Sequence, residues 1–232
     1  MRIVITGCKG QLGAVLCRRL AGHELFSLDL PEYDITRVDS IEPAIVGFRP
    51  DVVIHTAAYT NVVGCERDPD LAQRVNVLGT QNVAVACQKA GAALCHISTN
   101  EVFDGRKGAP YLEYDERHPL SAYARSKYAA ERCVETLLNR FYIVRIAWLF
   151  APGGNNFVSK ICAVARERGR LRIVTDEVSS PTYAPHLAEA LAQLVQTEHY
   201  GVYHLTNEGI CSRYEFAGYF LPLAGLGHVE VE

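Results

Sequence analysis

A loop of three glycines near the start of the chain limits the fold more than any other feature. Residues 7–13 read Gly-Cys-Lys-Gly-Gln-Leu-Gly, between a short β-branched apolar run at 3–6 and an apolar pattern of helical spacing at 11–20. Glycines let the backbone turn tightly and approach a pyrophosphate closely, and the N-terminus of the next helix offers free N–H groups and a positive dipole end. The strand, loop and helix therefore predict a dinucleotide-binding turn.

Strands continue to alternate with helices through most of the chain. We expect further strands at 24–29, 51–55, 93–98 and 142–147, and helices starting at a capping box of Asp39 and Glu42, at 70–90 and at 121–138. This alternation is typical of βαβ units. It predicts an α/β fold with a doubly wound parallel sheet that is covered on both faces.

The pattern loosens after Trp148. We expect helices at 156–167 and 185–196, strands at 171–174 and 202–205, and a last helix opened by a capping box of Ser212 and Glu215. Residues 1–150 are therefore predicted to form the dinucleotide-binding domain. Residues 151–232 are predicted to form part of a small second lobe, with an approximate boundary because the chain interleaves.

Composition and charge exclude several classes of partner. The formal net charge of −3 provides no basic field for nucleic acid or an anionic membrane. No apolar run approaches the roughly 18 residues of a membrane span, and the first strand is too short for a signal-peptide core, so we expect a cytoplasmic protein. The eight cysteines are spread singly without zinc-ligand spacing, which predicts reduced thiols and no metal site.

The end of the second predicted strand indicates how the cofactor is chosen. Asp29 lies 16 residues after Gly13, where a carboxylate can accept hydrogen bonds from the adenosine ribose and would repel a 2′-phosphate. Leu30 and Pro31 follow it in place of an arginine, which favours NAD(H). Lys9 in the glycine loop is a cation that keeps NADP(H) open as well.

Three residues have the chemistry of carbonyl reduction. Tyr123 and Lys127 stand four positions apart on a predicted helix and so share one face. Thr99 follows the fourth strand, at the edge of the sheet where parallel α/β folds bind ligands. A phenol has a pKa near 10, and a nearby ammonium lowers it. We therefore expect Tyr123 to donate a proton, Lys127 to lower its pKa and hold the nicotinamide ribose, and Thr99 to orient the carbonyl.

With these motifs the chain resembles an extended short-chain dehydrogenase/reductase of the Rossmann type, and more narrowly the dTDP-4-dehydrorhamnose reductase family. The matching segments run in order through nearly the whole chain, at 7–13, 49–53, 57–60, 76–80, 97–99, 102–105, 123–127, 145–148, 154–158 and 180–182. The resemblance implies NAD(P)H-dependent reduction of the 4-keto group of a nucleotide sugar, namely dTDP-4-dehydro-L-rhamnose to dTDP-L-rhamnose. A homodimer is expected from the resemblance alone.

The resemblance also implies roles for individual residues. It places Thr99, Tyr123 and Lys127 in catalysis. It assigns to the cofactor, besides Tyr123 and Lys127, residues Gly7, Gly10, Gln11, Leu12, Gly13, Asp29, Asp34, Ile35, Ala57, Ala58, Tyr59 and Thr60. It assigns to the sugar substrate Val62, Thr99, Asn100 and Trp148, and an indole suits a pyranose face because it offers apolar area and one N–H.

Three departures from the family pattern leave alternatives open. Asn100-Glu101 replaces the family's Asp-Tyr, Val62-Val63 replaces Val-Asp, and the sequence stops at Glu232 where the family continues for some tens of residues. The altered acids and an incomplete lobe would also suit a dinucleotide-binding regulatory subunit like that of methionine adenosyltransferase. Another extended short-chain epimerase or reductase acting on a different nucleotide sugar is the third alternative.

Overall fold

The computed structural model describes residues 1–232 and divides into two compact units. The first unit comprises Met1–Ile146 and Ala188–Leu205, and the second comprises Ala147–Leu187 and Thr206–Glu232. None of the helices has the length and apolar character needed to cross a membrane. All eight cysteines are free thiols.

The first unit is built on a six-stranded sheet in the order β10-β5-β4-β3-β1-β2, with every neighbouring pair parallel. Its central strands are buried along almost their whole length, as expected of a sheet covered on both faces. The strands are β1 Arg2–Thr6, β2 Glu24–Leu28, β3 Val52–His55, β4 Ala93–Thr99, β5 Phe141–Ile146 and β10 Gly201–His204. The predicted α/β fold with a doubly wound parallel sheet is confirmed.

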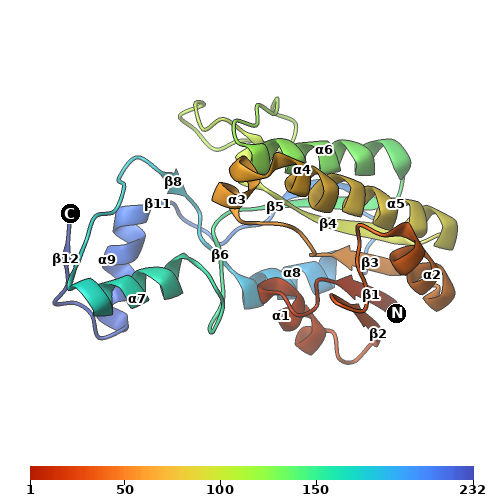
Figure 1. Ribbon diagram of the computed structural model, residues 1–232, viewed down its shortest axis with the longest axis horizontal. Helices are drawn as coiled ribbons and strands as arrows, with labels where there is room; N and C mark the ends of the chain where they lie inside the picture. Colours follow the sequence, from red (N-terminus) through yellow and green to blue (C-terminus); the bar gives the residue numbers. More distant parts are fainter. The chain divides into compact units, whose positions relative to one another are not determined.

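Helices cover both faces of this sheet (Figure 1). In the view shown, α5 Gly79–Ala90 and α6 Ala122–Leu137 lie above the strands, and α1 Gln11–Arg19 lies below them. Helix α2 Val38–Phe48 packs against α5. The last part of α8, Ala184–Leu194, returns to the first unit. A core cluster that includes Val4, Ile41, Val83 and Ile143 fills the space between strands and helices.

Two of three expectations about local structure were wrong in detail. Asp39 does not cap a helix, because α2 begins one residue earlier with Arg37 at its N-cap, and the Asp39 carboxylate accepts from the Arg37 guanidinium at 2.8 Å. The helical stretch predicted at 70–90 is present, and it comprises α4 Pro69–Ala72, a π-helical turn at Gln73–Leu78, and α5. The strand expected at 171–174 is only β7 Arg170–Leu171, because its partner β12 Glu230–Val231 has two residues.

The second unit has two helices and three short strand pairs. Its core cluster joins α7 Phe157–Arg168 and α9 Arg213–Leu223 through buried residues such as Cys162, Ala217 and Phe220. The capping box predicted for Ser212 and Glu215 is present at the start of α9. The paired strands are β6 Leu149–Phe150 with β9 Thr182–Tyr183, β8 Val178–Ser179 with β11 Cys211–Ser212, and β7 with β12.

Candidate active site

The carboxyl ends of the central strands bring the predicted cofactor and catalytic segments to one edge of the sheet. Strands β1 and β3 are neighbours, with Thr6 opposite His55, and β4 lies beside β3. The chain leaves β1 toward β2 on one side and returns to β3 on the other, so the strand order reverses between β1 and β3. In open parallel sheets this is the point at which ligands bind.

The glycine loop after β1 is folded so tightly that it leaves no room for a Cβ at Gly7 or Gly13. Gly7 has φ +71°, and a Cβ there would lie 2.6 Å from the backbone nitrogen of Ala57. A Cβ on Gly13 would lie 2.1 Å from the Gly7 carbonyl oxygen. Gly10 is the N-cap of α1 and has no side chain to cap the helix. The loop therefore presents backbone amides at a helix start, and these residues fit a dinucleotide pyrophosphate.

Asp29 and Lys9 form the corner where the adenosine ribose is expected. The Asp29 carboxylate accepts from the backbone N–H of Lys9 at 2.7 Å and from that of Leu30 at 2.8 Å. The Lys9 ammonium donates to the Leu30 carbonyl and lies 3.5 Å from a carboxylate oxygen of Glu32. A carboxylate and an ammonium thus border the same corner, and both charges are exposed enough to contact a bound group.

Asp34 and Ile35, also predicted to bind the cofactor, shape the next turn. The Asp34 carboxylate accepts from the backbone N–H of Thr36 at 2.9 Å and from its hydroxyl at 2.8 Å. Ile35 is buried, and a Cβ on Gly79 would meet its Cδ1 at 2.7 Å. The Asp34 side chain is bound to Thr36, and the Ile35 side chain packs against Gly79. The backbone of this turn is therefore the part that remains to face a cofactor.

The segment Ala57–Thr60 after β3 is held by a residue that the sequence reasoning did not assign to the site. Asn76, buried in the π-helical turn, accepts from the Tyr59 N–H at 2.7 Å and donates to the Tyr59 carbonyl at 3.0 Å. Its amide also donates to the Ser126 hydroxyl at 2.9 Å. The sequence did contain a signal for this role. Asn76 is a polar residue in a segment that matches the family, within a helical stretch whose other inward positions are mostly apolar.

The segment that follows holds Val62, a residue predicted to contact substrate. Val62 is the first residue of α3 Val62–Arg67, which Asn61 caps by accepting from the Gly64 N–H at 3.0 Å. The side chains of Val62 and Val63 are exposed.

The end of β4 holds Thr99 and Asn100. Thr99 is buried, and its hydroxyl accepts from the Glu101 N–H at 3.2 Å and lies 3.4 Å from the Asn100 amide oxygen. Glu101, where the family has tyrosine, lies within 3.5 Å of the Ser121 hydroxyl at the start of α6. A carboxylate is therefore brought close to the catalytic helix.

Tyr123 comes from the first turn of α6, which Ser121 caps by accepting from the Ala124 N–H at 3.0 Å. Burial and the nearby Glu101 carboxylate raise the pKa of the Tyr123 phenol, and a hydrogen bond with Thr99 acts in the opposite direction. The structure thus brings Thr99 and Tyr123 together as predicted. The Tyr123 phenol has a higher pKa than the sequence predicted, so it is a weaker acid.

The expected effect of Lys127 on Tyr123 is wrong for this structure. The Lys127 ammonium is buried and donates to the Ile97 carbonyl at 2.7 Å, with the Nε2 of His96 at 3.3 Å. It therefore points along β4, and it is not among the groups that shift the pKa of Tyr123. Burial lowers the pKa of Lys127 itself to about 8.

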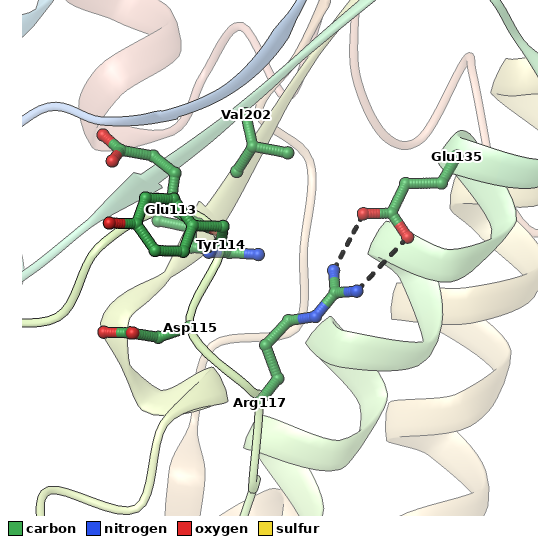
Figure 2. Close-up of a pocket in the computed structure, with 7 residues that line it drawn as sticks. Glu113, Tyr114, Asp115, Arg117, Glu135 and Val202 are labelled. Carbon is green, nitrogen blue, oxygen red and sulfur yellow. Dashed lines mark hydrogen bonds and ion pairs between the residues drawn. The ribbon is translucent and has the colours of Figure 1, made fainter. Parts of the chain in front are cut away.

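A buried ionic network lies one turn further along α6. Glu131 accepts from Arg145 at 2.9 Å and 3.0 Å, from Arg117 at 3.0 Å, and from the Ser98 hydroxyl. Arg117 also reaches Glu135 at 2.8 Å, at one side of a polar hollow of about 360 Å³ (Figure 2). The network ties α6 to β4 and β5 directly beside Thr99, and the sequence reasoning assigned none of it to the site.

Trp148 lies in the second unit. Its φ of +46° is uncommon for a bulky residue. The Arg213 guanidinium stacks over its ring at 3.6 Å, and its carbonyl accepts from the Thr182 N–H at 3.3 Å. A left-handed backbone and a stacked cation hold the indole in one orientation.

A doubly wound parallel sheet with this glycine loop at its switch point defines the class of Rossmann-type short-chain reductases and epimerases. The model of the RmlD substrate binding domain family matches residues 1–232. The chain belongs to this family.

Known proteins similar to the chain agree with this membership. A dTDP-4-dehydrorhamnose reductase of Aggregatibacter actinomycetemcomitans is 40% identical over 225 residues, covering 93% of this chain and 76% of that protein. The spore coat polysaccharide biosynthesis protein SpsK of Bacillus subtilis is 37% identical, and the match covers 97% of this chain and 80% of that protein. The crystal structure of dTDP-4-dehydrorhamnose reductase from Bacillus anthracis in complex with NADP has a TM-score of 0.94 at 39% identity, covering 100% and 82%.

Proposed function

We propose that this chain is an NAD(P)H-dependent oxidoreductase that reduces the 4-keto group of dTDP-4-dehydro-L-rhamnose to dTDP-L-rhamnose. The observation that carries the proposal is the contact of Thr99 with Tyr123 at the same carboxyl edge of the sheet as a glycine loop that fits a dinucleotide. Family membership over the whole chain and the bound NADP of the Bacillus anthracis relative support it.

The proton chemistry follows from the residues at the end of β4. A bound reduced nicotinamide would supply a hydride to the carbonyl carbon, and the carbonyl oxygen would then need one proton. Tyr123 donates that proton, while the Thr99 hydroxyl holds the oxygen. A phenol with a raised pKa remains protonated at neutral pH and is ready to act as the acid. Lys127 then stabilises the phenolate that Tyr123 becomes, once its ammonium turns from Ile97 toward the phenol.

The remaining predicted residues divide between cofactor and sugar. We assign the pyrophosphate to the loop residues Gly7, Gly10, Gln11, Leu12 and Gly13, the adenosine ribose to Asp29 and Lys9, and the cofactor's middle part to the backbone of 34–35 and 57–60. Asn100, Val62 and Trp148 are assigned to the sugar. We further propose that the first unit is the cofactor domain and that the second is part of the substrate lobe.

Consumption of NADPH or NADH, followed at 340 nm with dTDP-4-dehydro-L-rhamnose, tests the proposal. Turnover that disappears in Tyr123→Phe, with NADPH binding retained, supports it. Absence of turnover in the unchanged protein while NADPH binds would sink it and favour the regulatory-subunit alternative. The homodimer and the cytoplasmic location stay predictions, which analytical ultracentrifugation and cell fractionation test.

A further inference from the structure

The buried ring of His96 has no role in the chemistry described above, although it touches the catalytic ammonium. His96 lies in the middle of β4 and has no exposed surface. Its Nε2 is 3.3 Å from Lys127 Nζ. Its Nδ1 is the buried side-chain polar atom that has no hydrogen-bond partner. A native interior leaves few such atoms, and each one calls for an explanation.

The contact with Lys127 fixes the protonation of the ring. An ammonium can only donate, so His96 Nε2 accepts and its single proton stays on Nδ1. Burial and the Lys127 charge lower the pKa of His96 well below its usual value, which keeps the ring neutral. The unpartnered N–H is therefore a direct consequence of using the other nitrogen to hold the lysine.

The Glu131 charge raises the pKa of Lys127, but His96 is the side chain that hydrogen-bonds the ammonium. The carboxylate of Glu131, one turn along α6, is already bound by Arg145, Arg117 and Ser98. His55 of β3 has both ring nitrogens occupied, by Thr6 at 2.6 Å and Thr80 at 3.1 Å.

Glu101 acts on Tyr123, and neither Glu101 nor Tyr123 shifts the pKa of Lys127. The ammonium thus has one carbonyl and one imidazole as its partners.

We propose that His96 is a positioning residue that keeps Lys127 charged and aligned along β4, ready to hold the cofactor ribose. This inference rests on the proposed function, because that function is what assigns Lys127 to the cofactor ribose. A neutral acceptor serves this purpose better than a carboxylate, because it stabilises the charge without forming an ion pair that cofactor binding would have to break.

The test measures the dissociation constant of NADPH by calorimetry between pH 6.5 and 8.5, with no sugar present. Loss of the acceptor in His96→Leu makes Lys127 deprotonate at lower pH, since the charged form loses a hydrogen bond. With a pKa of about 8 for Lys127 and a downward shift of about one pH unit, binding should weaken about eightfold at pH 8.5 and less than twofold at pH 6.5.

Two variants separate positioning from general damage. His96→Gln supplies an amide oxygen as acceptor and should restore most of the binding at pH 8.5. His55→Asn, which changes the neighbouring buried ring that does not bond Lys127, should leave the pH dependence as it is. His96→Phe keeps the volume of the ring and tests the same loss if the leucine variant does not fold.

Equal weakening at both pH values, or no weakening at either, would overturn the inference. So would failure of the unchanged protein to bind either NADPH or NADH, which overturns the proposed function as well. Absence of sugar turnover alone contradicts only the proposed function, because cofactor binding is measured without sugar.

Discussion

The substitution Glu131→Gln tests how far the buried ionic network stabilises the first unit. Glu131 has no exposed surface, and Arg145 beside it is 2% exposed. Gln keeps the shape of the side chain, but it loses the charge and turns one acceptor oxygen into a donor. The Arg145 guanidinium and the Ser98 hydroxyl then face an N–H₂ group where they had a carboxylate.

The expected cost is large because a buried charge loses its partner. Removing one member of a buried pair typically costs about 3–5 kcal/mol, since the other charge stays out of water. For a chain of 232 residues each kcal/mol shifts the melting temperature by about 2–4 °C. We therefore expect a fall of roughly 6–20 °C in the transition of the first unit.

Differential scanning calorimetry at pH 7 measures this fall, and Glu135→Gln is the matched control. Glu135 lies one turn further on the same helix and shares Arg117 at 2.8 Å, but its side chain is partly exposed. Pairs of that kind contribute at most about 1 kcal/mol, so its melting temperature should fall by less than about 4 °C. A loss in Glu131→Gln no greater than in the control would refute the argument from burial.

Three further predictions concern the cofactor and the reaction. Tyr123→Phe should lower kcat by about 10²–10⁴-fold in the NADPH assay, as for loss of a general acid. Gly13→Ala should abolish NADPH binding in calorimetry, because its Cβ would lie 2.1 Å from the Gly7 carbonyl, whereas Gly22→Ala, with nothing within 4 Å, should bind normally. Lys9→Ala should weaken NADPH binding about two- to fivefold more than NADH binding, since only NADPH has a 2′-phosphate near that cation.

Local pattern was enough to predict most of the first unit. The sheet strands have continuous apolar runs, and the glycine loop needs its residues at fixed positions because two of them leave no room for a Cβ. Ser212 and Glu215 are capping partners three residues apart, so their contact was visible in the sequence. Asp39 and Glu42 have the same spacing, but Asp39 pairs with Arg37 within an earlier helix start.

The parts that escaped prediction depend on contacts between distant segments. Asn76 and Tyr59 are 17 positions apart, and Ser98 and Glu131 are 33 apart. The π-helical turn around Asn76 follows from such a contact, because that backbone brings the amide to Tyr59 and Ser126 at once. No periodicity of the sequence contains this information.

The orientation of Lys127 shows why two residues can be predicted to share a helix face while the interaction between them is not. Spacing on a helix places Tyr123 and Lys127 on one face, but it says nothing of acceptors on the strand beneath. The Ile97 carbonyl and the His96 ring supply those acceptors, so the ammonium rests on β4 and the phenol keeps its proton. A reductase needs a protonated phenol before hydride transfer and a stabilised phenolate after it. Acceptors on the strand thus decide which groups the ammonium bonds, and a pattern of spacing along the helix does not contain them.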